Sequence, residues 1–186
     1  MNSLLGFIER MKKRWVLYRS PAEYACFIGV QIGDDCRLIG LTLSTFGSEP
    51  YLVSLGNHVT VTSGVGFLTH DGGVWVFRKE HPDIDIVAPI TVGNNVFIGI
   101  NTIILPGVAI GNDCIIGAGS VVTRDISSCT VAAGVPAKQI CSINDYWNKV
   151  EGKAIYSRSW DAKRKKEYFQ QYASTYKDSK ERKNEH

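Results

Sequence analysis

The stretch "THDGG", Thr69–Gly73, brings an imidazole, a carboxylate and two glycines together. An imidazole titrates near neutral pH, so His70 is a candidate general base. A base of this kind removes the proton from a hydroxyl while its oxygen attacks a thioester carbon, and it typically contributes about 10²–10⁴-fold in rate. Asp71 could hold the other ring nitrogen. Adjacent residues of an extended segment point in opposite directions, however, so another carboxylate or a backbone carbonyl could orient His70 instead.

Three further side chains of the same irregular stretch could contact a substrate. Trp75 and Phe77 are aromatic residues that could stack on a sugar ring, and His81 in "RKEHPD" could contact the acceptor or a neighbouring subunit. His81 is also the alternative candidate for the catalytic base. His58, in contrast, falls in a turn of a regular repeat, where we expect an exposed side chain.

A six-residue repeat follows this stretch and predicts the elements that hold it. From Val92 the chain reads "VGNNVF", "IGINTI", "ILPGVA", "IGNDCI", "IGAGSV" and "VTRDIS". Each unit opens with an aliphatic residue, at positions 92, 98, 104, 110, 116 and 122. The same pattern occurs earlier, with openers Leu55, Val61 and Phe67, and more weakly over 32–40.

A period of six matches neither an α-helix nor a single alternating strand. It is typical of short strands separated by turns in register, so that three sides close a triangular coil and successive coils stack as parallel strands. The opener would point inward on every side, and glycine in second place suits a tight turn. Cys36 and Cys114 fall in the fifth, inward place, where we expect small buried side chains and not catalytic thiols.

Residues 70–91 break the six-residue rhythm for about the length of one coil. A long loop inside a compact domain is usually functional or disordered, and the aromatic content of this one argues against disorder. We therefore expect an excursion that opens a site beside the coils, with Gly72 and Gly73 turning the chain away from them.

Helical segments are expected at both ends of the coils. Residues 1–25 place apolar positions 4, 5, 8, 11 and 15 on one helical face, which predicts packing against the coils or a neighbouring subunit, with contact to a membrane surface as the alternative. Ser142 could cap a helix with support from Asp145, and a further helix is expected at 161–176. The predicted organisation is a helical segment at 1–25, the β-helix domain at 26–141 and a helical tail at 142–186.

Composition argues against several function classes. The 186 residues carry a net charge of +3, too small to indicate nucleic-acid binding, and no stretch is long and apolar enough for a transmembrane segment. Five cysteines without a CxxC pair suggest neither a disulfide framework nor a zinc cage, so no metal is expected. No signal peptide is recognised, which predicts a cytoplasmic location.

These motifs resemble those of a known family. "FLTHDGG", "EHPD", the repeats from "APITVGNNVF" to "SVVTRDI" and then "AAGVPAKQI" are similar to the acetyl-CoA-dependent O-acetyltransferases of the hexapeptide-repeat family, over residues 55–143. That group includes galactoside, maltose, xenobiotic and polysaccharide-building enzymes. The resemblance implies a mainly all-β fold, the left-handed parallel β-helix, assembled as a homotrimer. It also implies acetyl-CoA as the acyl donor and His70 as the catalytic base.

The resemblance further implies a donor slot between neighbouring subunits. Phe97 takes the place of an aromatic residue that packs against the pantetheine arm, and Gly99 would let that arm approach the backbone. Arg124 and Lys138 take the places of residues that meet the nucleotide end and the phosphates, for which cations are suited. For Gly99 and Ala118, the geometry of the repeat alone is an equally good explanation. The implied donor-binding residues are Phe97, Gly99, Ala118, Thr123, Arg124 and Lys138.

The expected function is transfer of an acetyl group from acetyl-CoA to a hydroxyl of a sugar, in the assembly of surface polysaccharide, capsule or lipopolysaccharide. The alternatives are N-acetylation of an amino nucleotide sugar, O-acetylation of an antibiotic, and an inactive β-helix that serves as a scaffold. A γ-type carbonic anhydrase is disfavoured, because that enzyme needs three zinc-binding histidines and residues 92–127 contain no histidine.

Overall fold

The structure is a computed structural model that describes the backbone of residues 2–184 and the side chains of residues 5–176. The chain forms two compact units, Met1–Asn148 and Lys149–His186. The first unit contains the coils and two helices that precede them, and the second contains the C-terminal helix. The last two positions of the predicted tail, 185 and 186, lie outside the described residues.

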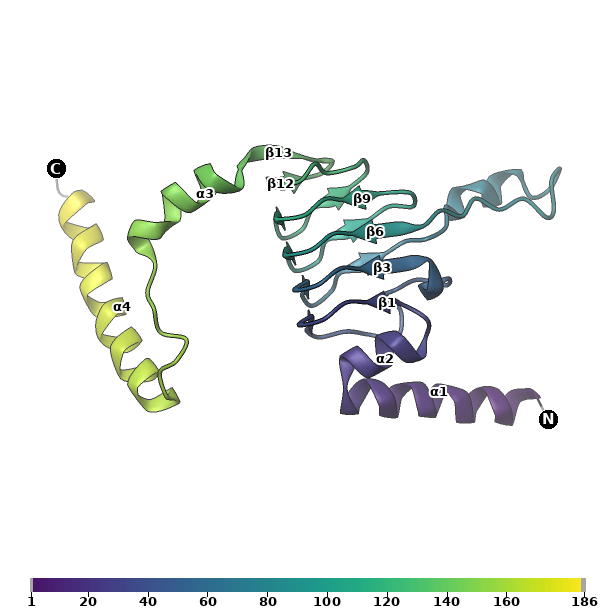
Figure 1. The fold of residues 1–186 in the computed structure, drawn as a ribbon, viewed down its shortest axis with the longest axis horizontal. Coiled ribbons are helices and arrows are strands. Elements are labelled where there is room, and N and C mark those ends of the chain that lie inside the picture. The colour runs from purple at the N-terminus through teal and green to yellow at the C-terminus, as the bar shows by residue number, and fades with distance from the viewer. Residues whose placement is uncertain (1, 185–186) are drawn as a thin grey trace. The chain divides into compact units, whose positions relative to one another are not determined.

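Short strands form three sheets, one on each side of a stack of coils (Figure 1). The first sheet contains β1 (Gln31–Ile32), β3 (Val53–Leu55), β6 (Ile90–Val92) and β9 (Ala109–Ile110). The second contains β2 (Arg37–Leu38), β4 (Thr60–Val61), β7 (Val96–Ile98), β10 (Cys114–Ile116), β12 (Thr130–Gly134) and β13 (Ala137–Ser142). The third contains β5 (Gly66–Phe67), β8 (Ile103–Ile104) and β11 (Val121–Val122). The strands pair in parallel, except in the antiparallel hairpin of β12 and β13.

The register of these strands confirms the predicted triangular coil. Val92 pairs with Ile110, 18 residues further along the chain, and the openers on the other two sides pair at the same interval. All nine predicted openers are buried, at positions 55, 61, 67, 92, 98, 104, 110, 116 and 122. Each coil therefore stacks its aliphatic residue on that of the next coil, and the stack forms one hydrophobic core.

The fifth place of each unit also faces the core, as predicted. Thr102 and Ser120 occupy it without leaving a buried hydroxyl unpaired, because each hydroxyl donates to a backbone carbonyl of its own turn, at 2.7 and 2.6 Å. Cys114 is buried there, and burial raises the pKa of its thiol. The prediction of a structural thiol is confirmed for Cys114, whereas Cys36 is only half-buried.

A ladder of polar side chains follows one corner of the coils. The Asn94 amide N–H donates to the Asn112 side-chain oxygen at 2.7 Å, and the Asn57 N–H donates to the side-chain oxygen of Asn94 at 2.8 Å. Asp34 and Ser128 continue the ladder on its two ends. The turns at this corner enter the left-handed region of backbone φ and ψ. Each of them therefore receives a hydrogen bond from the next coil of the stack.

Two helices cover the first coil. In α1 (Asn2–Arg19) the side chains of Lys13, Val16 and Leu17 are half-buried, while most of the helix is exposed. The short helix α2 (Pro21–Phe27) begins at Ser20, whose hydroxyl accepts the Glu23 N–H at 3.2 Å. Its buried Tyr24 and Ala25 close the core at this end of the stack.

The segment after the coils is helical. The Ser142 hydroxyl accepts the Asp145 N–H at 3.1 Å at the start of α3 (Ile143–Val150), which confirms the predicted cap. In the second unit, the 3₁₀ turn η3 (Glu151–Lys153) precedes α4 (Ala162–Asn184). This last helix extends beyond the predicted end at residue 176. No helix among the described residues is long and apolar enough to cross a membrane.

Candidate functional site

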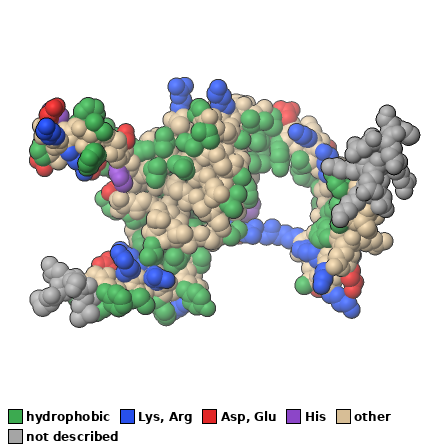
Figure 2. All heavy atoms as spheres, turned by 180° about the vertical axis from the view of Figure 1, so that it is seen from behind, with side chains coloured by type: hydrophobic (Ala, Val, Ile, Leu, Met, Phe, Trp, Pro, Cys, Tyr) green, Lys and Arg blue, Asp and Glu red, His purple; other side chains and the backbone are tan. Residues whose placement is uncertain are grey.

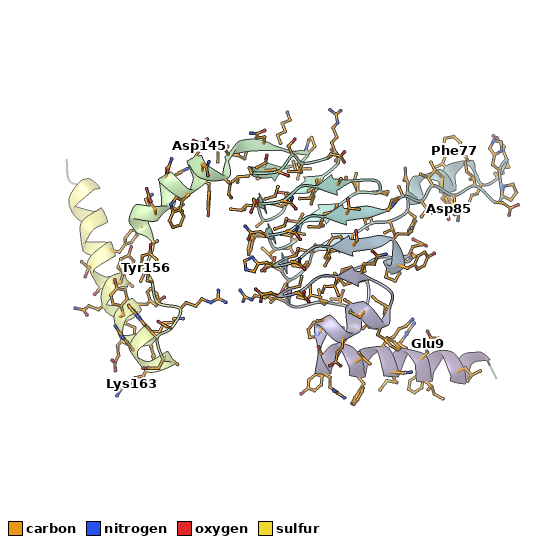
Figure 3. All side chains as sticks on the ribbon, viewed as in Figure 1. Glu9, Phe77, Asp85, Asp145, Tyr156 and Lys163 are labelled. Carbon is orange, nitrogen blue, oxygen red and sulfur yellow. The ribbon has the colours of Figure 1, made fainter. Side chains whose placement is uncertain are left out.

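The excursion leaves and returns to the coils at a single point. His70 forms an antiparallel bridge with Val87, flanked by the hydrogen bonds from Asp71 N to Ile86 O at 2.8 Å and from Ala88 N to Thr69 O at 2.9 Å. Figure 3 labels Phe77 and Asp85 on the part that projects beyond the coils. Because both ends of the excursion are tied at this bridge, the backbone of His70 is fixed by the coils.

A second interruption of the repeat supplies the residue beside His70. Ile32 pairs with Leu55, 23 residues away, so the coil between them contains five extra residues compared with the regular coils. This insertion includes η1 (Pro50–Leu52) and the segment before it. The Phe46 ring stacks on Phe67 at 5.2 Å between centroids, and Phe67 N donates to Thr45 O at 2.8 Å. These contacts hold the insertion against the strand that leads to His70.

Glu49 lies at the end of this insertion and reaches the catalytic candidate. Its Oε2 atom is 3.3 Å from Nδ1 of His70, and the Thr69 hydroxyl donates to the same oxygen at 2.9 Å. Nδ1 is inaccessible to solvent although the His70 side chain is 38% exposed, so the accessible part is the rest of the ring. The two atoms lie within hydrogen-bond distance but do not form a hydrogen bond in this geometry, and catalytic hydrogen bonds often tighten only when substrate binds.

Asp71 has a different partner. Its side chain accepts the Gly73 N–H at 2.8 Å and so caps the 3₁₀ helix η2 (Gly72–Phe77). Glu49, which the sequence analysis did not single out, is the carboxylate next to His70. The available sequence signal was the loss of the six-residue rhythm between 40 and 55, where Glu49 lies.

The three predicted acceptor contacts are all exposed. Trp75 and Phe77 lie on η2, and the His81 N–H donates to Phe77 O at 2.9 Å. Within the described residues, no hydrogen bond, ion pair or ring contact joins any of the three side chains to His70. The excursion therefore presents these side chains to solvent or to another molecule, and their role stays a prediction.

Three of the predicted donor-binding residues share one hollow. Thr123, Arg124 and Lys138 line a pocket of about 540 Å³ between the end of β11 and the β12–β13 hairpin. Asp125 also lines it, but this carboxylate accepts the Ala109 N–H at 2.8 Å. No acidic side chain of the described part pairs with Arg124 or Lys138, so two cations remain available to an anionic group.

The other three predicted donor contacts lie together on neighbouring coils. Phe97 on β7 is 46% exposed, and Gly99 and Ala118 occupy adjacent turns. A Cβ atom on Gly99 would approach the backbone nitrogen of Ala118 to 2.5 Å. The stacking of coils therefore requires glycine at position 99 whether or not a ligand is bound.

His58 is exposed in a turn with φ of 55°, and its Nδ1 lies 2.8 Å from the Asn95 side-chain oxygen, which confirms the expected exposed turn position. Across the described residues, no group of three or more His, Cys, Asp and Glu side chains could hold a metal ion.

Comparison with known proteins identifies relatives of this chain. Residues 89–124 match the family model described as bacterial transferase hexapeptide (six repeats). Protein CapG of Staphylococcus aureus is 57% identical over 141 residues, which cover 76% of this chain and 82% of CapG. Galactoside O-acetyltransferase of Escherichia coli (strain K12) is 41% identical over 97 residues, which cover 52% of this chain and 47% of that enzyme.

Solved structures agree with these relatives. The hexapeptide-repeat acetyltransferase VCA0836 from Vibrio cholerae, in complex with acetyl coenzyme A, superposes with a TM-score of 0.51 at 27% identity. The match covers 61% of this chain and 60% of that one. The repeats match the family model, and relatives that are named acetyltransferases match 52–61% of this chain. The chain therefore belongs to the hexapeptide-repeat transferase family, and it is an acetyltransferase.

Proposed function

We propose that this acetyltransferase moves the acetyl group of acetyl-CoA to a hydroxyl of a sugar, with His70 as the general base. The acceptor would belong to the assembly of a surface polysaccharide, capsule or lipopolysaccharide, in the cytoplasm, where the five free cysteines stay reduced. A relative named for its action on galactosides, 41% identical over half of this chain, supports a sugar acceptor. The structure of VCA0836 with acetyl coenzyme A supports the choice of donor.

The observation that carries this proposal is the contact between His70 and Glu49. A carboxylate at 3.3 Å from Nδ1 favours the tautomer in which Nδ1 carries the proton. The lone pair on Nε2 is then available to a substrate, on the part of the ring that is not buried. The Thr69 hydroxyl donates to the same carboxylate oxygen and keeps it in place.

The reaction follows from this arrangement. Nε2 of His70 takes the proton of the acceptor hydroxyl while the oxygen attacks the thioester carbon of acetyl-CoA. The tetrahedral intermediate collapses, the carbon–sulfur bond breaks, and the acetyl group stays on the acceptor oxygen. The thiolate of CoA leaves and receives the proton from the imidazolium ring. Glu49 would stabilise that imidazolium, because opposite charges at this distance attract.

The proposal includes a left-handed β-helix and a homotrimer with the donor slot shared between subunits. Arg124 and Lys138, which have no acidic partner in the described part of the chain, are suited to the phosphates of the donor.

Trp75 and Phe77 are more than half exposed in the single chain. A neighbouring subunit that packs over the excursion would bury this apolar surface. Light scattering measures the subunit number, and a monomer would exclude the shared slot.

The deciding experiment measures acetyl-CoA turnover with a panel of sugars, nucleotide sugars and chloramphenicol-like alcohols. His70→Asn should lower kcat by about 10²–10⁴-fold on the best acceptor, because a general base typically contributes this much. His58→Asn is the matched control, since His58 is exposed in a turn where its ring contacts Asp35 and Asn95, and it should keep near-full turnover. Near-full turnover by His70→Asn would show that the catalytic assignment is wrong.

The same panel separates the competing functions. Preferred turnover of an amino nucleotide sugar would indicate N-acetylation, and preferred turnover of the antibiotic alcohol would indicate a xenobiotic acetyltransferase. Absence of both turnover and acetyl-CoA binding would indicate the inactive scaffold.

A further inference from the structure

The outer face of α1 is apolar and has no partner in the chain. Five large side chains fall within about 100° of arc at 100° per residue and therefore share one face of the helix. They are 50–91% exposed, although they include some of the largest apolar residues of the chain. These residues, the α1 stripe, are Phe7, Ile8, Met11, Trp15 and Tyr18.

The opposite face of α1 already has a role. Val16 and Leu17 are half-buried, and Leu17 lines a hollow with Leu41 and Leu43 of the first coil. Figure 1 shows α1 lying across the end of the coil stack, and Figure 2 shows hydrophobic side chains along the edge of α1 that is remote from the coils. Tyr18 lies at the rim of the same hollow, together with Arg14, so the rest of the α1 stripe is the part that points away from the core.

Basic residues border this stripe on both sides. At 100° per residue, Arg10 and Arg14 lie along one edge and Lys12 and Arg19 along the other. The single acidic residue of α1, Glu9, is paired with Lys13 at 3.0 Å, and Arg19 is 3.9 Å from Glu23 of α2. Arg10 and Arg14 have no acidic partner among the described side chains. The Arg19 guanidinium lies over the Trp15 ring at 5.0 Å, which keeps an aromatic ring and a cation side by side.

We infer that the α1 stripe binds the surface of an anionic membrane. An apolar stripe with aromatic residues and cationic borders is the pattern of a helix that lies in the plane of a lipid interface. Lysine and arginine beside the stripe would meet the lipid headgroups while the apolar side chains enter the acyl boundary. A second copy of α1 is a poor partner for this face, because it would bring two sets of cations together.

Docking through α1 would hold the protein at the membrane, and α1 itself would take no part in the chemistry. This inference goes beyond the proposed acetyl transfer and has its own measurement. We expect the purified protein to sediment with vesicles of phosphatidylcholine and phosphatidylglycerol, but not with vesicles of phosphatidylcholine alone. Because the attraction is electrostatic, raising the salt concentration should release the protein from the vesicles.

Two variants and two matched controls test the role of the stripe. Trp15→Glu should abolish sedimentation, and the double variant Arg10→Gln/Arg14→Gln should weaken the partition coefficient by about fivefold for each charge removed. Trp147→Glu changes a tryptophan on α3 that is 50% exposed, close to the 58% of Trp15, and should bind like the unchanged protein. The double variant Arg37→Gln/Lys149→Gln removes the same charge from other exposed positions and should also bind normally.

Three results would overturn the inference. The first is absence of binding to anionic vesicles, and the second is equal binding by all four variants. The third is a changed subunit number for Trp15→Glu in light scattering, which would assign the stripe to a contact between copies of the chain. Turnover without vesicles should be the same in all four variants, so a failure of vesicle binding remains distinct from a failure of the proposed catalysis.

Discussion

The regular coils and the excursion at 70–91 differ in how far their side chains are buried. In the coils, every opener of the repeat is buried, and each backbone turn obtains hydrogen bonds from its neighbours. In the excursion, almost all side chains between residues 71 and 87 are at least partly exposed, with Val74 as the buried exception. The coils therefore supply stability, and the excursion is free to carry residues that stability does not require.

The comparison also shows where the site is made. His70 stands at the base of the excursion, and Glu49 stands at the end of a smaller insertion one coil earlier. Both residues lie where the repeat is interrupted, yet both are held by contacts to regular coils. Precise placement of catalytic groups depends on such rigid support, because small displacements cost rate.

The largest expected effect separates the two regions by stability. Ile98→Ala removes a fully buried opener, and we expect the free energy of unfolding to fall by about 2–5 kcal/mol. Trp75→Ala in the excursion should change it by less than about 0.5 kcal/mol, because Trp75 is exposed. Urea denaturation at one fixed protein concentration measures both. A large loss of stability in Trp75→Ala would show that the excursion is part of a core formed on assembly.

The coils could be predicted from sequence because the repeat is a local rule. Each opener has the same environment as the opener 18 residues away, so a pattern of single residues determines its burial. The cap at Ser142 was predictable for the same reason, since its partner Asp145 is only three residues away. In the first coil the pattern is weak, and Cys36 is correspondingly less buried than Cys114.

The partner of His70 could not be predicted in this way. Glu49 and His70 are brought together by an insertion whose length and path follow no repeat, through the stacking of Phe46 on Phe67. The sequence instead offered Asp71, which is adjacent in the chain but turns toward the Gly73 amide. Contacts between two irregular segments depend on tertiary packing, so only the structure revealed this pair.

The second expected effect tests which carboxylate serves His70. Glu49→Gln keeps the shape of the side chain but removes its charge, and we expect kcat to fall by about 10²-fold because the ring loses its orientation. The KM values for acetyl-CoA and the acceptor should stay nearly unchanged, and Glu49→Asp should restore little activity because the carboxylate no longer reaches Nδ1. Steady-state kinetics with the best acceptor measure this difference between kcat and KM.

Asp71→Asn is the matched control for Glu49→Gln. Asparagine retains an oxygen that can accept the Gly73 N–H, so the start of η2 should be preserved. We expect nearly full kcat in this variant. A loss of kcat in Asp71→Asn as large as that in Glu49→Gln would assign the excursion, and not the insertion, as the source of the orienting charge.

The smallest expected effect concerns the polar ladder at the corner of the coils. Asn94→Ala removes the acceptor of the Asn57 N–H at 2.8 Å, and a hydrogen bond of this kind contributes about 1 kcal/mol to the free energy of unfolding. Asn144→Ala, at an exposed position of α3, is the control and should stay within about 0.5 kcal/mol of the unchanged protein. Thermal or urea unfolding measures both. If Asn94→Ala matches Asn144→Ala, the corner ladder adds no stability, because water would replace the lost acceptor at this exposed turn. The stability of the coils would then come from the buried openers alone. Coils and excursion would differ in stability only because the coils bury apolar side chains and the excursion largely does not.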